Sequence, residues 1–148
     1  MKIFAKKFII FGGNYFINIL KPITSWIIWD KRAGKHSWYS DCELAWTNLG
    51  KPMKIYDCVW QGMIREGKKE KREHPTQKPI KLLSDILKDF SKWGEIVTDC
   101  FSGSGSTLIA CEKTNRKCFG MEIDPYYCQV IIDRWEKFTG KKRKQINV

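Results

Sequence analysis

Apolar residues in the second half of the chain form short continuous runs separated by segments with helical spacing. The runs at 94–100 and 116–123 predict buried strands, because unbroken apolar stretches of this length are typical of parallel sheets. The segments at 106–115 and 124–140 predict helices. This order of strand, helix, strand and helix is typical of an α/β fold with a parallel sheet.

Residues that start and stop helices agree with this pattern. Asp124 is expected to cap the last helix, with Pro125 at its first position and Gly140 as its stop. A further helix is predicted at 79–90, with Pro79 in its first turn. Its apolar positions recur at helical spacing, at Ile80, Leu83, Leu87 and Phe90.

The first half of the chain reads as three strands and an irregular segment. Residues 7–16 predict a buried strand that ends at the Gly12–Gly13 pair, and 25–31 and 41–48 predict two more. Residues 49–73 hold no strong periodicity. No internal repeat is visible, and 148 residues suit one domain.

Charge indicates the kind of partner. Lys and Arg number 27 against 16 Asp and Glu, a net charge of +11, which favours a polyanion. Nucleic acid is preferred over membrane because no basic amphipathic helix stands out and no segment approaches a membrane span. The six Cys form no C-x-x-C pair, so reduced thiols in a cytoplasmic protein are expected and no metal site.

The stretch DCFSGSGSTLIACEK, residues 99–113, predicts a strand, a tight glycine turn and a helix, an arrangement that commonly holds a nucleotide. The turn lacks the Lys of a phosphate-binding loop, and Leu108 replaces the third glycine of the dinucleotide fingerprint. Asp99 would repel phosphate and suit a cation, and Glu122 is placed to accept hydrogen bonds from ribose hydroxyls. A cationic nucleoside without phosphate describes S-adenosylmethionine (SAM). The alternative is a plain strand-to-helix turn with a capping acid.

The segment HPTQKPIKLL followed by TDCFSGSGSTLIACEKTNRKCFGMEIDPYY resembles the amino-group DNA methyltransferases whose cofactor motif follows the catalytic motif. FIIFGGNYF, WIIWDK and SDCELAWT resemble a small phage-like subgroup. The resemblance implies SAM as methyl donor and transfer to adenine N6 or cytosine N4 in duplex DNA, with adenine N6 preferred. The cofactor residues it implies are Asp99, Phe101, Gly103, Gly105 and Glu122, with Thr76 and Lys78 near the methionine end.

The implied fold is a Rossmann-like methyltransferase sheet, circularly permuted and incomplete, in one domain fragment over 1–148. In this organisation 1–48 flank the target base and 49–73 form a short target-recognition segment. Residues 74–140 bind SAM, and 141–148 form a basic tail. The recognition sequence and the oligomeric state are not indicated.

The family's catalytic motif, [DNS]-P-P-[YFW], is absent, because every proline of the sequence is isolated. Asp124–Pro125 follows the wrong strand and is interpreted as a helix start, so the catalytic residues are unknown. In full-length relatives the motif would precede KFIIFGG, and the sequence resembles a methyltransferase without its N-terminal third. The strand that carries the motif would lie between 95–100 and 8–11, so a second chain supplies it, the sheet rearranges, or the fragment is weakly stable.

DNA contacts are expected from the basic residues of the recognition segment. These are Arg65, Lys68, Lys69, Lys71 and Arg72, which are mixed with three Glu, so a solvated loop is the alternative. Trp26 or Trp29 either lines the base pocket or packs in the core, and His74 is expected to orient its loop. Three functions stay open: a methyltransferase portion completed by another segment, an inactive SAM- or DNA-binding remnant, and a SAM enzyme for RNA or a small molecule.

Overall fold

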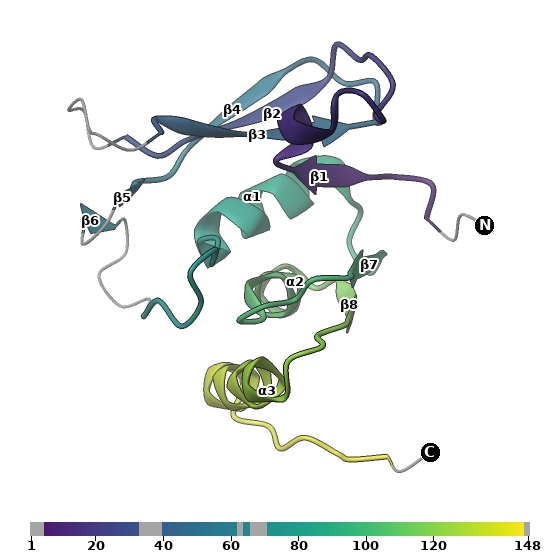
Figure 1. The fold of residues 1–148 in the computed structure, drawn as a ribbon. Coiled ribbons are helices and arrows are strands. Elements are labelled where there is room, and N and C mark those ends of the chain that lie inside the picture. Colours follow the sequence, from purple (N-terminus) through teal and green to yellow (C-terminus); the bar gives the residue numbers. More distant parts are fainter. Residues whose placement is uncertain (1–4, 33–39, 62–63, 66–70, 147–148) are drawn as a thin grey trace. The chain divides into compact units, whose positions relative to one another are not determined.

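The computed structural model describes residues 5–32, 40–61, 64–65 and 71–146 (Figure 1). The chain divides into two compact units, Met1–Lys68 and Lys69–Val148. Each unit has its own sheet or sheets. The prediction of a single domain stays a prediction.

The first unit is built on a four-stranded sheet in the order β1-β3-β2-β4. Strand β3 pairs antiparallel with both β1 and β2, whereas β4 pairs parallel with β2. A short antiparallel pair, β5–β6, and a 3-10 helix, η1, complete the described elements of the unit. Their bounds are β1 Ile9–Phe11, η1 Gly13–Phe16, β2 Trp26–Asp30, β3 Cys42–Thr47, β4 Lys54–Asp57, β5 Trp60–Gln61 and β6 Ile64–Arg65.

Alternation along β2 determines which of its side chains are buried. Ile27 and Trp29 are almost fully buried, and their intervening neighbours are half-buried, as the period of a strand requires. The indole Nε1 of Trp29 donates to the carbonyl of Cys58 at 2.8 Å, which satisfies a buried polar group. Trp29 is therefore a core residue rather than part of a base pocket.

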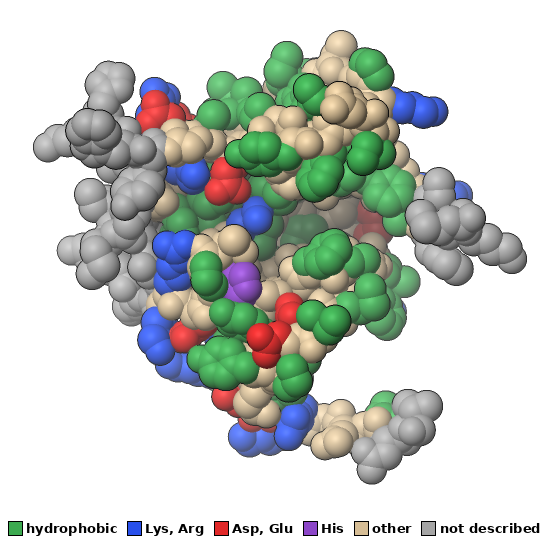
Figure 2. Space-filling view, viewed as in Figure 1, with side chains coloured by type: hydrophobic (Ala, Val, Ile, Leu, Met, Phe, Trp, Pro, Cys, Tyr) green, Lys and Arg blue, Asp and Glu red, His purple; other side chains and the backbone are tan. Residues whose placement is uncertain are grey.

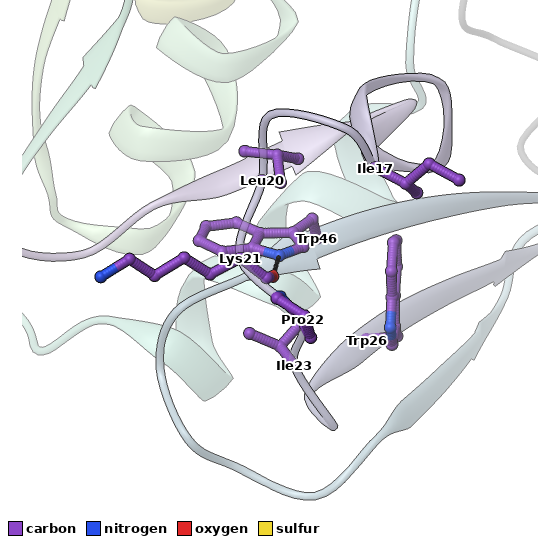
Figure 3. Close-up of a pocket in the computed structure, with 7 residues that line it drawn as sticks. All are labelled: Ile17, Leu20, Lys21, Pro22, Ile23, Trp26 and Trp46. Carbon is purple, nitrogen blue, oxygen red and sulfur yellow. Dashed lines mark hydrogen bonds between the residues drawn. The ribbon is translucent and has the colours of Figure 1, made fainter.

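Trp26 lies opposite Trp46 in the β2–β3 register, and both line a cavity of about 220 Å³ (Figure 3). Residues of the segment from Ile17 to Ile23 form the rest of its lining, and the indole Nε1 of Trp46 donates to the carbonyl of Lys21 at 3.0 Å. The remaining lining is mostly apolar, so the cavity is a gap in the packing beneath this segment.

The second unit contains three helices and one parallel strand pair, β7–β8, among its described residues. Helix α2 packs against α1, β8 and α3. The bounds are α1 Ile80–Phe90, β7 Ile96–Asp99, α2 Ser106–Thr114, β8 Lys117–Gly120 and α3 Pro125–Thr139. All three predicted helices and both predicted strands of this half are present.

The helix ends follow the residues that were expected to set them, with one difference. The Asp124 side chain accepts from the backbone N–H of Tyr126 at 2.8 Å, and Gly140 ends α3 with a φ of 71°. Pro79 was expected in the first turn of α1 but is its N-cap, with an extended ψ of 136°. Its ring fixes φ near the helical value while leaving ψ free, so it precedes the helix.

The parallel pairing predicted from the second half of the sequence is present as β7–β8, whereas β3 of the first unit is antiparallel to both of its neighbours. Residues 49–73, which showed no periodicity, contribute β4, β5 and β6. Strand β4 is mostly exposed and is formed through its pairing with β2, so no buried face marks it in the sequence.

All six Cys are free thiols, with Cys58 and Cys111 buried. In the part of the chain that the structure describes, no helix is long and apolar enough to cross a membrane.

Arg116 forms hydrogen bonds to the C-terminal ends of both α1 and α2. Its guanidinium donates to the carbonyls of Leu87 at 3.2 Å and Ser91 at 2.7 Å, to Ser91 Oγ at 3.0 Å, and to the carbonyl of Thr114. The carbonyls of Ser91 and Thr114 lie at helix ends, where partners within the helix are lacking, so one forked cation satisfies both and adds a bond to the carbonyl of Leu87.

Replacing Arg116 with Lys should destabilise the second unit by about 1–3 kcal/mol, because an ammonium group cannot reach the same carbonyls from one position. Urea unfolding followed by circular dichroism measures the change. Arg143→Lys in the tail is the control, since Arg143 donates its backbone N–H to Glu136 and the substitution keeps that group. Equal midpoints for the two variants would contradict this role of Arg116.

Candidate cofactor site

The C-terminal end of β7 brings Asp99 beside the first residues of the turn. Its Oδ1 atom accepts from the backbone N–H of Phe101 at 3.1 Å, and its carbonyl accepts from Met121 N at 2.9 Å. In the register Asp99 lies opposite Gly120, so the two parallel strands end together. Polar groups at the ends of β7 and β8 are therefore neighbours, as in other open α/β sheets.

Two glycines make the turn that follows. Gly103 and Gly105 have φ of +52° and +77°, in the left-handed region that favours glycine. A Cβ built on Gly105 would lie 3.1 Å from the side chain of Ile131 on α3, closer than ordinary van der Waals contact. Gly105 is thus required both for its backbone conformation and for the close approach of α3.

Glu122 joins the glycine turn to the end of β8. Its Oε2 atom accepts from Gly103 N at 2.7 Å, and Oε1 accepts from Ile123 N and Asp124 N at 3.0 Å each. These backbone N–H groups, led by those of Asp124 and Gly103, hold the pKa of the Glu122 carboxyl below its usual value.

The structure therefore adds a second role to the one predicted for Glu122. The sequence indicated an acceptor for ribose hydroxyls, and the carboxylate is already engaged with the backbone of the turn. A carboxylate has about four lone-pair positions, so three bonds leave capacity for a ligand hydroxyl.

His74 lies against the same turn. Its Nδ1 atom is 3.1 Å from Thr76 N and 3.0 Å from Thr76 Oγ1, which fixes the local loop as the sequence predicted. The ring packs edge-to-face on Tyr127, with centroids 4.4 Å apart, and lies 3.6 Å from the Cβ position of Gly103. His74 thus brings Thr76 to the Gly103 turn.

Gln77 braces this loop from inside. It is buried, accepts from Glu73 N at 2.8 Å and donates to the carbonyl of Lys71 at 3.0 Å. Lys78 is half-buried just before α1, and its predicted place at the methionine end of a cofactor stays a prediction.

Three further residues lie at the candidate site although the sequence did not predict them as cofactor residues: Ser106, Ile123 and His74. Ser106 is buried at the start of α2, and its Oγ has no hydrogen-bond partner among the described residues, which is rare for a buried hydroxyl. Ile123 is 96% exposed beside Glu122, and Phe101, which was predicted, is 91% exposed beside Asp99. An apolar residue directly after a strand-end acid is the signal that could have identified Ile123. His74 was expected only to orient its loop.

The residues predicted to contact DNA are only partly described. Lys68 and Lys69 lie outside the described residues, and Arg65 is the last residue of the short strand β6. Lys71 pairs with Glu73 at 3.1 Å, and both side chains have access to solvent. Arg72 donates to the carbonyls of His74 and Pro75, so it also supports the loop beside the glycine turn.

Gly105→Ala should destabilise the chain more than Gly140→Ala, although the two glycines have similar φ of +77° and +71°. Backbone strain is common to both, and about 1–3 kcal/mol of overpacking against Ile131 is specific to Gly105. Urea midpoints measure the difference. Ile131→Ala should reduce the cost of Gly105→Ala in a double-mutant cycle, and additive costs would contradict the packing argument.

Comparison with known proteins places this geometry in a family. Residues 30–133 match the family model N6_N4_Mtase, described as DNA methylase. The Type II methyltransferase M2.MboI of Moraxella bovis is 30% identical over 133 residues, which cover 84% of this chain and 48% of that protein. The DNA adenine methyltransferase YhdJ of Escherichia coli is 37% identical over 82 residues, covering 55% and 28%.

Among solved structures, the M1.HpyAVI–SAM complex shares the fold with a TM-score of 0.62 at 23% identity, covering 87% of this chain and 74% of that one. The chain spans about half the length of the M2.MboI protein. The family model matches more than half of the sequence, including β7, the glycine turn and Glu122. The chain therefore belongs to the N6/N4 DNA methylase family.

Proposed function

We propose that this chain is the cofactor-binding portion of a methyltransferase that transfers a methyl group from SAM to an exocyclic amino group in duplex DNA, with adenine N6 preferred over cytosine N4 as the acceptor. The main support is the hydrogen bond from Gly103 N to the Glu122 carboxylate. This bond holds the glycine turn, which lacks the Lys of a phosphate-binding loop, beside the acid at the end of β8. Adenine is preferred over cytosine because one matched relative is a DNA adenine methyltransferase.

The residues present fit SAM. The turn holds no Lys, and Asp99 stands at its start, which suits a sulfonium cation better than a phosphate. The hydroxyl of Ser106 is a hydrogen-bonding group without a partner in the described part of the chain, at the start of α2. Exposed apolar side chains on both strand ends, Phe101 and Ile123, are available to pack on a purine ring.

Each residue then has a defined task. Glu122 accepts from one ribose hydroxyl with its remaining lone pair, and Gly103 and Gly105 allow close approach of the ligand to the backbone. Thr76 and Lys78 hold the methionine end, where the Lys ammonium group pairs with the carboxylate. SAM, when bound, supplies the electrophilic methyl group.

The described site positions a methyl donor but contains no assigned group for the acceptor amine. Transfer to an exocyclic amine requires hydrogen-bond acceptors that orient the nitrogen and a ring that holds the extruded base. We infer that a segment with [DNS]-P-P-[YFW] supplies them, in a permuted sheet whose catalytic strand lies outside this sequence. The isolated chain is expected to transfer no methyl groups to DNA.

A second candidate is a non-catalytic remnant that binds SAM or DNA. The absence of any Pro-Pro pair from the sequence favours it, since the catalytic motif requires one. The two functions share the cofactor site and differ in whether a complementing segment restores transfer.

Glu122→Ala should weaken SAM binding by about 1–3 kcal/mol, because it removes the acceptor for a ribose hydroxyl. Calorimetry with SAM and with a SAM analogue lacking both hydroxyls measures the two contributions of Glu122. The substitution should reduce the affinity for the analogue less than the affinity for SAM. The analogue has no hydroxyl for Glu122 to bind, so its affinity falls only because the Gly103 turn is loosened.

The control is Glu136→Ala on α3, which removes the ion-pair partner of Lys142 in the tail. This variant should bind SAM normally. Equal SAM affinity for wild type and Glu122→Ala, both folded by circular dichroism, would reject the cofactor assignment. A folded wild-type chain that binds no SAM would reject it as well.

Duplex DNA binding should depend on salt through the basic segment before His74. Replacing Lys68, Lys69 and Lys71 with Ala should reduce the slope of log affinity against log salt by about 0.9 for each phosphate that the variant no longer neutralises. Arg72 is left in place because it supports the His74 loop. Fluorescence anisotropy with a labelled duplex measures the slope.

The comparison variant replaces the four basic residues of the tail, Lys141, Lys142, Arg143 and Lys144. A slope that changes only in the tail variant would move the DNA contacts away from the predicted recognition segment. An unchanged slope in both variants would contradict binding through either segment.

A further inference from the structure

One face of helix α3 lies along the glycine turn. Tyr127, Ile131 and Arg134 are four and three positions apart, so their side chains share one side of the helix. Tyr127 packs on the loop before α1, and Ile131 lies against Gly105. The third residue, Arg134, donates from its guanidinium Nη1 to the carbonyl of Ser104, which stands between the two glycines. Helix α3 therefore contacts the turn through a polar bond as well as through packing.

The carbonyl of Ser104 needs a partner from outside the turn. Ser104 is 3% exposed, and a buried carbonyl without a hydrogen bond is costly. The first backbone bond of α2 runs from Ile109 N to the carbonyl of Gly105, so Ser104 lies one residue before the helical ladder. Arg134 satisfies this carbonyl from 30 residues further along the chain. The bond is charge-assisted and thus stronger than one between neutral groups.

The same bond fixes the orientation of one peptide group. Because the peptide unit is planar, the direction of the Ser104 carbonyl also sets the direction of the Gly105 N–H, which donates to the carbonyl of Ser102 at 2.7 Å. Glycines stand on both sides of Ser104 with positive φ, and glycine adopts other conformations about as readily. The turn therefore depends on outside contacts to select one conformation, and Arg134 provides one of them.

The turn is held from two sides while the residues assigned to the cofactor stay accessible. Glu122 binds Gly103 N from the end of β8, and Arg134 binds the next residue from α3. Phe101 and Ile123 beside them are exposed. Figure 2 shows hydrophobic and acidic side chains together at the surface where β8 leads into α3. A ligand that approaches the backbone of this turn meets a preset conformation, and preset sites bind more tightly.

We propose that Arg134 is a positioning residue for the cofactor, which holds the Ser104–Gly105 peptide in the conformation that receives SAM. It acts through the carbonyl of Ser104 and not by touching the ligand. This role rests on the proposed function, because it presumes that the glycine turn is the place where SAM binds.

The test compares Arg134→Ala, Arg134→Lys and the unaltered chain in calorimetry with SAM. Arg134→Ala should weaken SAM binding about tenfold or more, the size expected from losing a hydrogen bond to a charged group. Arg134→Lys keeps a cationic donor for one carbonyl and should recover most of that affinity. The matched control is Trp135→Phe, which removes the bond from Trp135 Nε1 to Glu112 Oε1 at 3.0 Å, a link from α3 to the last turn of α2. It should bind SAM normally.

Urea unfolding of the same variants separates positioning from stability, and affinities are compared where every variant is folded by circular dichroism. A folded Arg134→Ala chain that binds SAM as tightly as the unaltered chain would overturn the proposal and leave the proposed function in place. Equal losses in Arg134→Ala and Trp135→Phe would also overturn it, since general loosening between helices would then explain both. A folded unaltered chain that binds no SAM rejects the proposed function and this role together.

A double-mutant cycle with Glu122→Ala tests whether both residues act on the same turn. When one hold is removed, the other can no longer present the turn correctly, so the double variant should lose less affinity than the product of the two single losses. Arg134→Ala and Glu122→Ala losses that multiply independently would contradict a shared action on the turn.

Discussion

The candidate site depends on one interaction, the pairing of the Glu122 carboxylate with the backbone N–H of Gly103. It connects the turn after β7 with the end of β8, two points 19 residues apart in the sequence. Because Oε1 also accepts from Ile123 N and Asp124 N, the carboxylate further fixes the entry into α3. These backbone bonds, led by those of Asp124 and Gly103, hold the pKa of the Glu122 carboxyl below its usual value.

The loop before α1 completes the site through packing rather than charge. The ring of His74 lies between Tyr127 of α3 and the Gly103 turn. The buried side chain of Gln77 bonds to the backbone of Lys71 and Glu73, just before His74. Arg72 contributes through the carbonyls of His74 and Pro75. A residue expected to meet phosphate therefore also takes part in ordering the cofactor side, which links the predicted DNA segment to the turn.

Local chemistry accounts for most of the second unit. Its helices and strands were predicted because Asp124, Gly140 and the apolar periodicities act over a few residues. The glycine turn and Asp99 were likewise predicted from adjacent letters of the sequence. Strands β4, β5 and β6 were not predicted, because they form through pairing with other strands and show no periodic apolar pattern of their own.

The sequence alone indicated SAM as the cofactor, since the turn lacks the Lys of a phosphate-binding loop and the third glycine of the dinucleotide fingerprint, and Asp99 precedes it. It also determined that no Pro-Pro motif is present. Only the tertiary structure decided that Glu122 is bonded to the turn and that Ser106 is buried without a partner among the described residues. Those properties depend on which distant segments meet, and hydrogen bonds and burial between such segments have no signature at the level of neighbouring residues.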